Sequence, residues 1–275
     1  MKNTDQFNKK VGELSYWFVF INVFLAGIVL IYFNDAIRFF LREDSIAESS
    51  GAFFLFLTGV FLFICFYICR KNIGNGEHQA YTKINTILFL LASVAFFWAA
   101  GEEISWGQRI FDFHTPSYLS EINQQNETNL HNLNTSFFNN GLESICLLFI
   151  LVSTILYVKN IRRVLGIVAP SLHLILIFQL TNGFIVYNAF SAQDSIPFIA
   201  LLVFIYIFIK QKNWRNLVFV LLNVFLTIFI AYMNITGREL FPNNGPREFR
   251  EYLFSFACLL YAFQMYRDLK IPKNS

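Results

Sequence analysis

The chain has 275 residues, of which 56% are hydrophobic, 35 are Phe and only 14% are charged. A soluble globular domain carries about 25% charged residues and far fewer Phe, so this composition excludes an ordinary soluble enzyme. The hydrophobic residues come in runs of about 18–20, long enough to cross a hydrocarbon core about 30 Å thick. They do not alternate as the strands of a membrane barrel would. The sequence therefore predicts an all-α, polytopic transmembrane helical bundle, with membrane lipids and no nucleic acid as its surroundings.

Eight apolar runs predict about eight membrane-spanning helices within a single membrane domain, 1–275. The runs cover about 14–33, 51–69, 84–101, 142–158, 164–182, 196–210, 216–233 and 249–266. The first run is longer than the apolar region of a signal peptide, so we expect it to be retained. All four cysteines lie inside these runs without CxxC spacing and are interpreted as core residues. The longest polar segment, 102–141, is predicted to be a loop that contains an interfacial helix.

The distribution of charge predicts the orientation in the membrane. The N-terminus, every second loop and the C-terminus together hold 15 of the 21 Lys and Arg residues, and the other loops hold 6. By the positive-inside rule, both termini are cytoplasmic. Of the 18 Asp and Glu residues, 14 fall on the opposite, outer side. With a residue bias typical of an AT-rich bacterial genome, the expected location is a bacterial plasma (inner) membrane, with an acidic surface facing outward.

Polar residues gather at the outer ends of the predicted helices. Glu102 and Glu103 follow directly on the apolar segment "LLASVAFFWAA" and open the stretch "GEEISWGQR". Ionisable groups at membrane depth are costly and usually functional. Other outer residues are predicted to form a wall or to contact the substrate, namely Glu48, Trp106, Gln108, Asn123, Glu248 and Glu251. We therefore place the candidate site on this side of the membrane.

The segment that follows has a helix start signal, with Thr115 as the N-cap and Pro116 at the first helical position. If that helix continues, Asn123, Glu127 and His131 recur every four residues and share one face. A glutamate and a histidine at this spacing can bind one metal ion or work as an acid/base pair. The alternative interpretation is an ordinary polar surface.

The stretch after the two glutamates favours an interfacial element lying along the membrane surface, because Trp106 and nearby aromatic residues suit that level. If the element is helical, Glu102, Trp106 and Arg109 share a face, and Arg109 can pair with Glu102. Such an ion pair is the purely structural interpretation of the motif. It leaves Glu103 without a role, and two adjacent carboxylates favour a site that handles protons.

The stretches "GEEISWGQR" and "TPSYLSEINQQNETNLHNL" resemble a recurring bacterial family of multi-pass membrane proteins with a GEExSWGQ…NxQxExNLHN pattern. The likeness covers about residues 95–135. It implies that Glu102, Glu103, Glu127 and His131 form one constellation, and it implies no particular reaction.

A looser likeness is to the membrane-embedded CAAX-type proteases, which use a Glu-Glu…Arg motif and further histidines to activate water. Glu102, Glu103 and Arg109 are similar to that motif, but Arg109 lies further from the glutamates than in that family. The later His-x-x-x-Asn element has no clear match, so we treat this likeness as a chemical analogy.

Three functions remain open. The first is a membrane-embedded hydrolase or transferase for a lipid, lipid-linked or membrane-peptide substrate, with Glu102, Glu103, Glu127, His131 and Arg109 as catalytic residues. A divalent ion, Zn or Mn, would then be held by Glu103, Glu127 and His131. The second is a cation-linked transporter, and the third is a membrane assembly subunit. The sequence does not name the substrate or the oligomeric state.

Overall fold

The computed structural model describes residues 2–32, 46–74, 83–123, 127–130, 133–183, 195–236 and 245–270, and the structural statements below concern these ranges. The described chain is almost entirely helical. Its long helices are α1 (Lys2–Tyr32), α3 (Ile46–Gly74), α4 (Lys83–Glu103), α7 (Thr135–Val158), α8 (Leu172–Gly183), α9 (Ser195–Lys210), α10 (Trp214–Thr236) and α11 (Gly245–Lys270). The short elements are η1 (Ser105–Gly107), α5 (Gln108–Phe111), α6 (Ser117–Ser120), β1 (Arg163–Val164) and β2 (Ile167–Val168).

Three of the described helices are long and apolar enough to cross a membrane. They cover Glu48–Asn72, Lys83–Glu103 and Asn140–Val158. Shorter apolar helices cover Leu172–Thr181, Ser195–Lys210 and Trp214–Ile230. The prediction of a helical membrane protein is thus confirmed at the level of three candidate spans, and the count of eight crossings stays a prediction.

The predicted fifth helix, 164–182, is wrong over its first residues. The chain from Arg163 to Val168 forms an antiparallel hairpin in which Arg163 is paired with Val168. Its two turn residues, Leu165 and Gly166, both have positive φ, 50° and 81°. A two-residue turn of this hand matches the twist of a hairpin, and Pro170 then delays the start of α8 to Leu172. The apolar composition alone did not reveal this turn.

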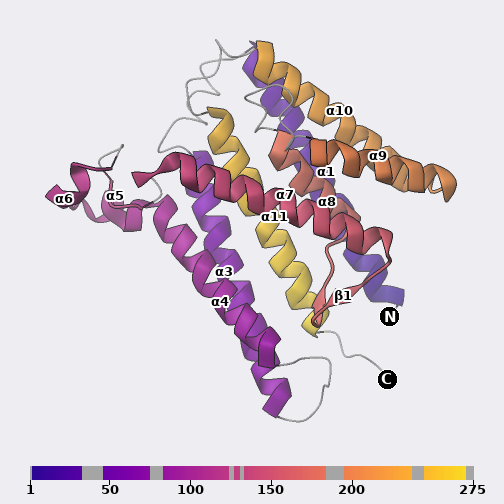
Figure 1. The fold of residues 1–275 in the computed structure, drawn as a ribbon, viewed down its shortest axis with the longest axis horizontal. Helices are drawn as coiled ribbons and strands as arrows, with labels where there is room; N and C mark the ends of the chain where they lie inside the picture. The colour runs from indigo at the N-terminus through magenta and orange to yellow at the C-terminus, as the bar shows by residue number, and fades with distance from the viewer. Residues whose placement is uncertain are drawn as a thin grey trace.

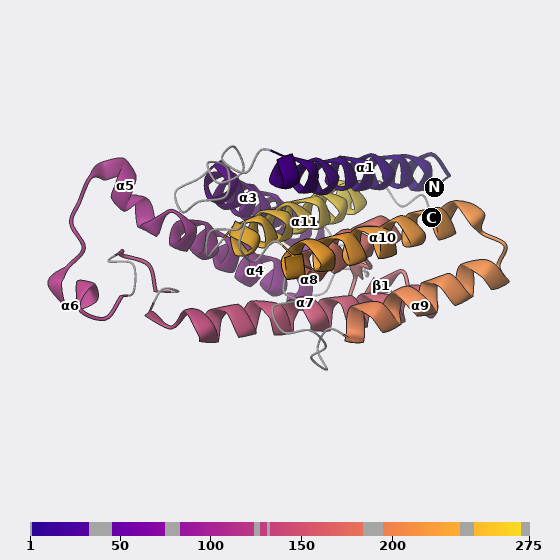
Figure 2. The same ribbon diagram turned by 90° about the horizontal axis from the view of Figure 1, so that it is seen from above.

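Helix α8 lies in the middle of the bundle, where α1, α7, α10 and α11 pack around it (Figures 1 and 2). Every residue from Leu172 to Thr181 is buried. A helix that is apolar on all sides is expected to be surrounded by other elements, and α8 meets that expectation. Helix α11 also packs along α3, which in turn packs along α4.

The bundle has two chemically different ends. Gly51 of α3 lies against Tyr252 of α11, since a Cβ at Gly51 would be 3.8 Å from the Tyr252 Cα, so both helices begin at the same end. We call this the acidic end, and α4 runs antiparallel to α3 and finishes there. At the opposite end, which we call the basic end, Arg163 near α8 pairs with Asp268 near the end of α11, with 2.5 Å between Nη2 and Oδ1.

Polar side chains also link three helices inside the bundle. The Tyr16 hydroxyl of α1 donates to the Phe219 carbonyl of α10 at 3.1 Å and to Asn223 Oδ1 at 3.2 Å. Asn223 Nδ2 in turn donates to Gln179 Oε1 of α8 at 3.3 Å. All three polar side chains are buried, so we call Tyr16, Asn223 and Gln179 the buried polar row.

Candidate functional site

The candidate site begins where α4 ends, in a sharp reversal of the chain. Ser105, Trp106 and Gly107 all have positive φ, 48°, 55° and 79°. Only glycine adopts this conformation freely, so the two other residues carry backbone strain, a feature that clusters at functional sites. The reversal folds the Trp106 indole back onto α4, where a Cβ at Gly101 would lie only 2.9 Å from the ring. Gly101 is therefore required for this close approach.

Glu102 joins the end of α4 to a segment almost thirty residues further along the chain. Its Oε1 accepts a hydrogen bond of 2.7 Å from Trp106 Nε1, and its Oε2 accepts one of 2.6 Å from the Leu130 backbone N–H. The Glu102 side chain is buried, with only 6% of the residue exposed. Buried carboxylates need such partners, and here both described donors are neutral groups.

Glu127 is held in a similar way from the other side. Its Oε2 accepts hydrogen bonds from Ser105 Oγ at 2.7 Å and from Asn129 Nδ2 at 2.5 Å. Its backbone N–H donates to Asn123 Oδ1 at 3.3 Å. Asn123 Nδ2 also donates to the Asn129 carbonyl at 2.8 Å. Ser105, Asn123 and Asn129 are all buried, so these bonds are shielded from water.

Gln108 takes part in the same hydrogen-bond network. Its Oε1 accepts from the Thr128 backbone N–H at 2.9 Å, and its Nε2 donates to Thr115 Oγ1 at 2.8 Å. The Thr128 hydroxyl donates to the Ser105 carbonyl at 2.6 Å. We call these polar residues, together with Glu102, the polar cluster; its members are Glu102, Ser105, Gln108, Asn123, Glu127, Thr128 and Asn129.

The predicted helix after Pro116 is wrong in its extent. Helix α6 covers only Ser117–Ser120, and Pro116 is its N-cap, not Thr115. Asn123 and Glu127 therefore do not share a helical face, although the structure brings them together through the Asn123 side chain. Asparagine side chains compete with helical hydrogen bonds by binding nearby backbone groups. Asn123 does this twice, with the Glu127 N–H and the Asn129 carbonyl.

The stretch around Trp106 is also not one continuous helix, because the three residues of η1, between α4 and α5, all have positive φ. Trp106 still reaches Glu102, by folding back and not by sharing a helical face. His131 lies outside the described residues, and so does the side chain of Arg109. The proposed Arg109–Glu102 pair and the predicted role of His131 thus stay predictions.

The remaining predicted wall residues belong to neighbouring helices at the acidic end. Glu48 lies in the first turn of α3, and Glu251 lies in the first turns of α11. Arg250 Nη2 is 3.4 Å from Glu251 Oε1, and Arg250 is 9% exposed. The side chain of Glu248 lies outside the described part of the structure. Glu103, the last residue of α4, is half-buried.

Four residues of the polar cluster and its frame were not singled out by the sequence. These are Ser105, Thr128, Asn129 and Gly101, to which the buried Arg250 can be added. Asn129 lies within the NxQxExNLHN part of the sequence pattern. This position was the one sequence signal that could have marked Asn129 as a site residue. Nothing in the local sequence marks Thr128 or Ser105, because their partners lie more than twenty residues away.

The described residues include no group of three His, Cys, Asp or Glu side chains placed to hold one metal ion. Of the predicted ligands, Glu103 and Glu127 lie at the acidic end, and Glu127 Oε2 is already bound by Ser105 and Asn129. The set predicted from sequence needs His131, which falls outside the described ranges. Metal binding is therefore left to experiment.

Exposed apolar side chains occur along the segment that projects beyond the end of α4 and at the start of α7 (Figure 1). They are Ile104, Trp106, Phe111, Phe113, Tyr118, Ile122, Leu130, Phe137 and Phe138. Aromatic side chains next to the end of an apolar helix are typical of the membrane–water interface. A polar site framed in this way suits a substrate with both a polar and an apolar part.

Comparison of the chain with protein-family models, with curated proteins and with solved structures gave no match.

Proposed function

We propose that the chain is an integral protein of a bacterial inner membrane, with about eight crossings and both termini in the cytoplasm. The pairing of helix ends supports this topology. Glu13 of α1 pairs with Arg215 of α10, and Arg163 pairs with Asp268, so four separate segments meet at the basic end. Basic residues are retained on the cytoplasmic side, so the acidic end faces outward.

At the acidic end we propose a membrane-embedded hydrolase or transferase that acts on a lipid, a lipid-linked group or a membrane peptide. The observation that carries the proposal is the fixation of Glu102 by Trp106 and Leu130. This fixation pins the last turn of a membrane-length helix, and the next residue in that turn is the half-buried Glu103. Preorganised groups at such a position need little rearrangement during a reaction.

In this proposal Glu103 is the reacting carboxylate, and the polar cluster is its frame. Glu103 would remove the proton from a water or alcohol as that oxygen attacks the substrate, while the leaving group is protonated in turn. Exposed aromatic side chains such as Trp106 would hold the apolar part of the substrate at the interface. If a divalent ion takes part, the ligands would be Glu103, Glu127 and His131, and the ion would lower the pKa of a bound water.

The test compares lipid extracts of cells that carry the chain, the Glu103→Gln variant or no copy, by mass spectrometry. Glu121→Gln is the matched control, since Glu121 is an exposed glutamate on the same segment. We expect at least one lipid or lipid-linked species to change with the wild type and the control but not with Glu103→Gln. If no species changes, a lipid or lipid-linked substrate is excluded, and if Glu103→Gln acts like the wild type, the proposal is wrong.

Metal content of the detergent-purified protein is the second arm of the test. Near-stoichiometric Zn or Mn that is lost in Glu103→Gln and His131→Ala would assign the metal set. A metal-free wild type that still changes the lipid extract would assign the reaction to carboxylate chemistry alone.

A second candidate function, cation-linked transport, is favoured by the buried polar row. Buried polar side chains within membrane helices often mark the path of an ion or substrate. For this function, Asn223→Leu would abolish cation-dependent uptake in proteoliposomes. For the hydrolase or transferase, the same substitution would leave the lipid-extract signal in place.

A further inference from the structure

Two tryptophan side chains meet on the surface of the acidic end. Trp98 lies in the last turns of α4, and Trp106 lies in the chain reversal that follows. Their ring centroids are 6.1 Å apart, and the ring planes are inclined by 67°. Trp98 is 50% exposed and Trp106 is 49% exposed. We call this pair of rings the tryptophan corner.

The orientation of Trp106 turns one face of its indole outward. A Cβ at Gly101 would lie 2.9 Å from Cε3, 2.9 Å from Cζ3 and 3.2 Å from Cη2 of the ring. Three consecutive ring atoms can be almost equally close to one point only if that point lies over the face of the ring. One face of the indole therefore packs on α4, and the exposed area includes the opposite face. Trp98 leaves α4 one turn before Gly101, so its ring stands beside the indole as a wall.

The indole is held in this orientation before any ligand binds. Glu102 Oε1 accepts a hydrogen bond of 2.7 Å from Trp106 Nε1, and Gly101 admits the ring because it has no Cβ. A ring that is already fixed loses little conformational entropy when a ligand binds to it. The face of an indole attracts a cation within about 6 Å of its centroid more strongly than that of Phe or Tyr. The corner therefore has the geometry of a site for a cation with apolar surface, such as an ammonium group.

The charge of the surrounding segment favours the same ligand. Residues 101–130 include five Asp or Glu side chains and one Arg. The segment is therefore negative overall, even when its arginine is paired with one of the acids. A negative surface raises the local concentration of cations and lowers that of anions. A lipid with a positively charged nitrogen is thus favoured over one whose headgroup carries only a phosphate charge.

An exposed apolar stripe on α4 leads to the tryptophan corner. Ile87, Leu91, Val94 and Trp98 recur every three or four residues, so they share one helical face, and all four are exposed. From Ile87 to Trp98, α4 rises about 16 Å at 1.5 Å per residue. That length is close to one leaflet, which is half of a hydrocarbon core about 30 Å thick. An acyl chain can therefore lie along α4 while its headgroup lies at the corner.

We propose that the tryptophan corner binds the ammonium headgroup of one phospholipid of the leaflet at the acidic end. In this arrangement the nitrogen lies over the outward face of Trp106 and beside Trp98, and an acyl chain lies along the stripe on α4. The methylene groups next to the nitrogen rest on the same rings, so Trp106 contacts both the charged and the apolar part. The inference rests on the proposed function in one respect, which is that this lipid is the substrate presented to Glu103 in the last turn of α4.

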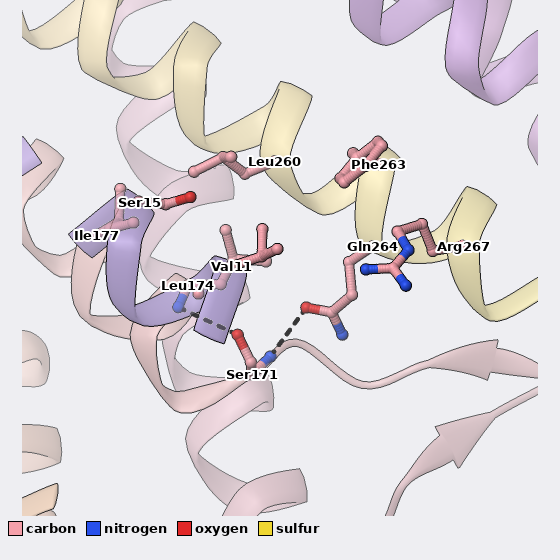
Figure 3. Close-up of a pocket in the computed structure, with 10 residues that line it drawn as sticks. Val11, Ser15, Ser171, Leu174, Ile177, Leu260, Phe263, Gln264 and Arg267 are labelled. Atoms are coloured by element: carbon pink, nitrogen blue, oxygen red, sulfur yellow. Dashed lines mark hydrogen bonds between the residues drawn. The ribbon is translucent and has the colours of Figure 1, made fainter. Parts of the chain in front are cut away.

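The hollow at the basic end differs from the tryptophan corner in size. It lies between α1, α8 and α11, and its lining includes Leu174, Leu260 and Arg267 (Figure 3). It has room for about one water molecule. The corner needs no cavity, because only the headgroup contacts the rings and the rest of the lipid stays in the bilayer. We therefore expect the selectivity for a headgroup to depend on the acidic end.

The experiment is native mass spectrometry of the full-length chain in detergent, with phosphatidylethanolamine, phosphatidylcholine and phosphatidylglycerol that have the same acyl chains. We expect the two ammonium lipids to bind about tenfold more tightly than phosphatidylglycerol, a ratio typical of a cation–π contact. Trp98→Leu removes one wall and should reduce this preference to about threefold or less. Trp214→Leu, which removes an exposed tryptophan at the basic end, should keep it.

A second arm changes the electrons of the Trp106 ring and keeps its shape. Tryptophan with an increasing number of ring fluorine atoms is placed at position 106. Fluorine withdraws electron density from the face of the indole, which weakens a cation–π contact, while the N–H that donates to Glu102 is retained. The preference for ammonium lipids should fall stepwise along this series. The same series at position 214 should leave the preference unchanged.

Equal binding of the three lipids, an unchanged preference in Trp98→Leu, or a flat fluorine series at position 106 would each overturn the proposal. Displacement of the lipid by millimolar choline would also overturn it, by showing that the site binds the ammonium ion and not the lipid. Failure of the proposed function is distinguished by the lipid extracts. A change in the extracts that depends on Glu103, together with equal binding of the three lipids, would retain the proposed function and exclude only the ammonium headgroup.

Discussion

The two ends of the bundle use charged residues in opposite ways. At the basic end, arginines pair with acids that lie far away in the sequence: Arg215 with Glu13, and Arg163 with Asp268. At the acidic end, Glu102 and Glu127 accept hydrogen bonds from an indole, a hydroxyl, a side-chain amide and a backbone N–H. All of these donors lie within a single stretch of the chain between 102 and 130.

The two kinds of interaction therefore have different roles. The ion pairs at the basic end add to existing packing, whereas the hydrogen bonds at the acidic end order the candidate site. Ion pairs at the basic end join elements that already pack against one another, α1 with α10 and the β1–β2 hairpin with α11. Exposed pairs add little stability. The bonds at the acidic end instead order a segment with little regular secondary structure, which has few other sources of stability. We therefore expect substitutions in the polar cluster to have larger local effects than substitutions in the ion pairs.

The largest effect is expected from Glu102→Ala. The substitution leaves the Trp106 indole N–H and the Leu130 N–H without their acceptor, and each hydrogen bond to a charged group is worth about 1.5–3 kcal/mol. We expect the segment to open more easily by about 3 kcal/mol, so that native-state proteolysis between 110 and 130 becomes about 100-fold faster. The measurement is the cleavage rate in mild detergent.

Glu121→Ala is the matched control for this variant, since the Glu121 side chain is exposed. It should be cleaved at nearly the wild-type rate. Equal rates for Glu102→Ala and the wild type would mean that the acidic end is not held by Glu102.

A smaller effect is expected from Gly101→Ala. The new Cβ would lie 2.9 Å from the Trp106 ring, so the indole must move away from Glu102. Overpacking of this kind costs about 1–3 kcal/mol, partly offset by the higher helix propensity of alanine. We expect cleavage of the segment to accelerate by about tenfold.

Gly141→Ala gives the comparison, because a Cβ at Gly141 of α7 meets nothing within 4 Å. This variant should keep the wild-type cleavage rate and gain up to about 1 kcal/mol of helix stability. If the two glycine variants behave alike, the close contact between Gly101 and Trp106 does not order the segment.

A third effect concerns the interior between the two ends. Asn223→Ala removes hydrogen bonds to Tyr16 and Gln179. Interhelical hydrogen bonds in membrane proteins average about 0.6 kcal/mol, so we expect a loss of about 1 kcal/mol in SDS-induced unfolding. Cleavage at the acidic end should not change. If Asn223→Ala lowered the stability to SDS and also accelerated cleavage at the acidic end, the interior and the acidic end would not be independent of each other.

The smallest effect is expected at the basic end. The Arg215 side chain is 58% exposed in its pair with Glu13, and exposed pairs contribute about 0–1 kcal/mol. Arg215→Gln and Glu13→Gln, alone and combined, should give a coupling energy below about 0.5 kcal/mol in SDS-induced unfolding. A coupling energy of about 3 kcal/mol, as large as the effect expected for Glu102→Ala, would contradict the view that the ion pairs at the basic end contribute less than the hydrogen bonds at the acidic end.

Much of the helical fold could be predicted, because a long run of apolar residues directly indicates a membrane-length helix. The predicted helix 84–101 is observed as Lys83–Glu103, and the shortest one, 196–210, is observed as Ser195–Lys210. The hairpin 163–168 was missed because its turn depends on Leu165 adopting a left-handed conformation, which leucine rarely does. Amino-acid composition does not indicate that Leu165 adopts this backbone conformation.

Four of the seven members of the polar cluster were predictable from the sequence, but their arrangement was not. Glu102, Gln108, Asn123 and Glu127 stand out as polar residues beside an apolar helix, and the structure brings them together. Their arrangement depends on contacts such as that between Glu102 and Leu130, 28 positions apart. Helical periodicity relates residues three or four positions apart and thus could not predict it.

The most direct test of the account is hydrogen exchange of the backbone amides of Thr128 and Leu130, followed by mass spectrometry of the purified protein. The account predicts that both amides are protected in the wild type, because Gln108 and Glu102 accept from them. It also predicts that the Leu130 amide loses protection in Glu102→Ala and keeps it in Glu121→Ala. Rapid exchange of both amides in the wild type would contradict the ordered site on which the proposed function depends.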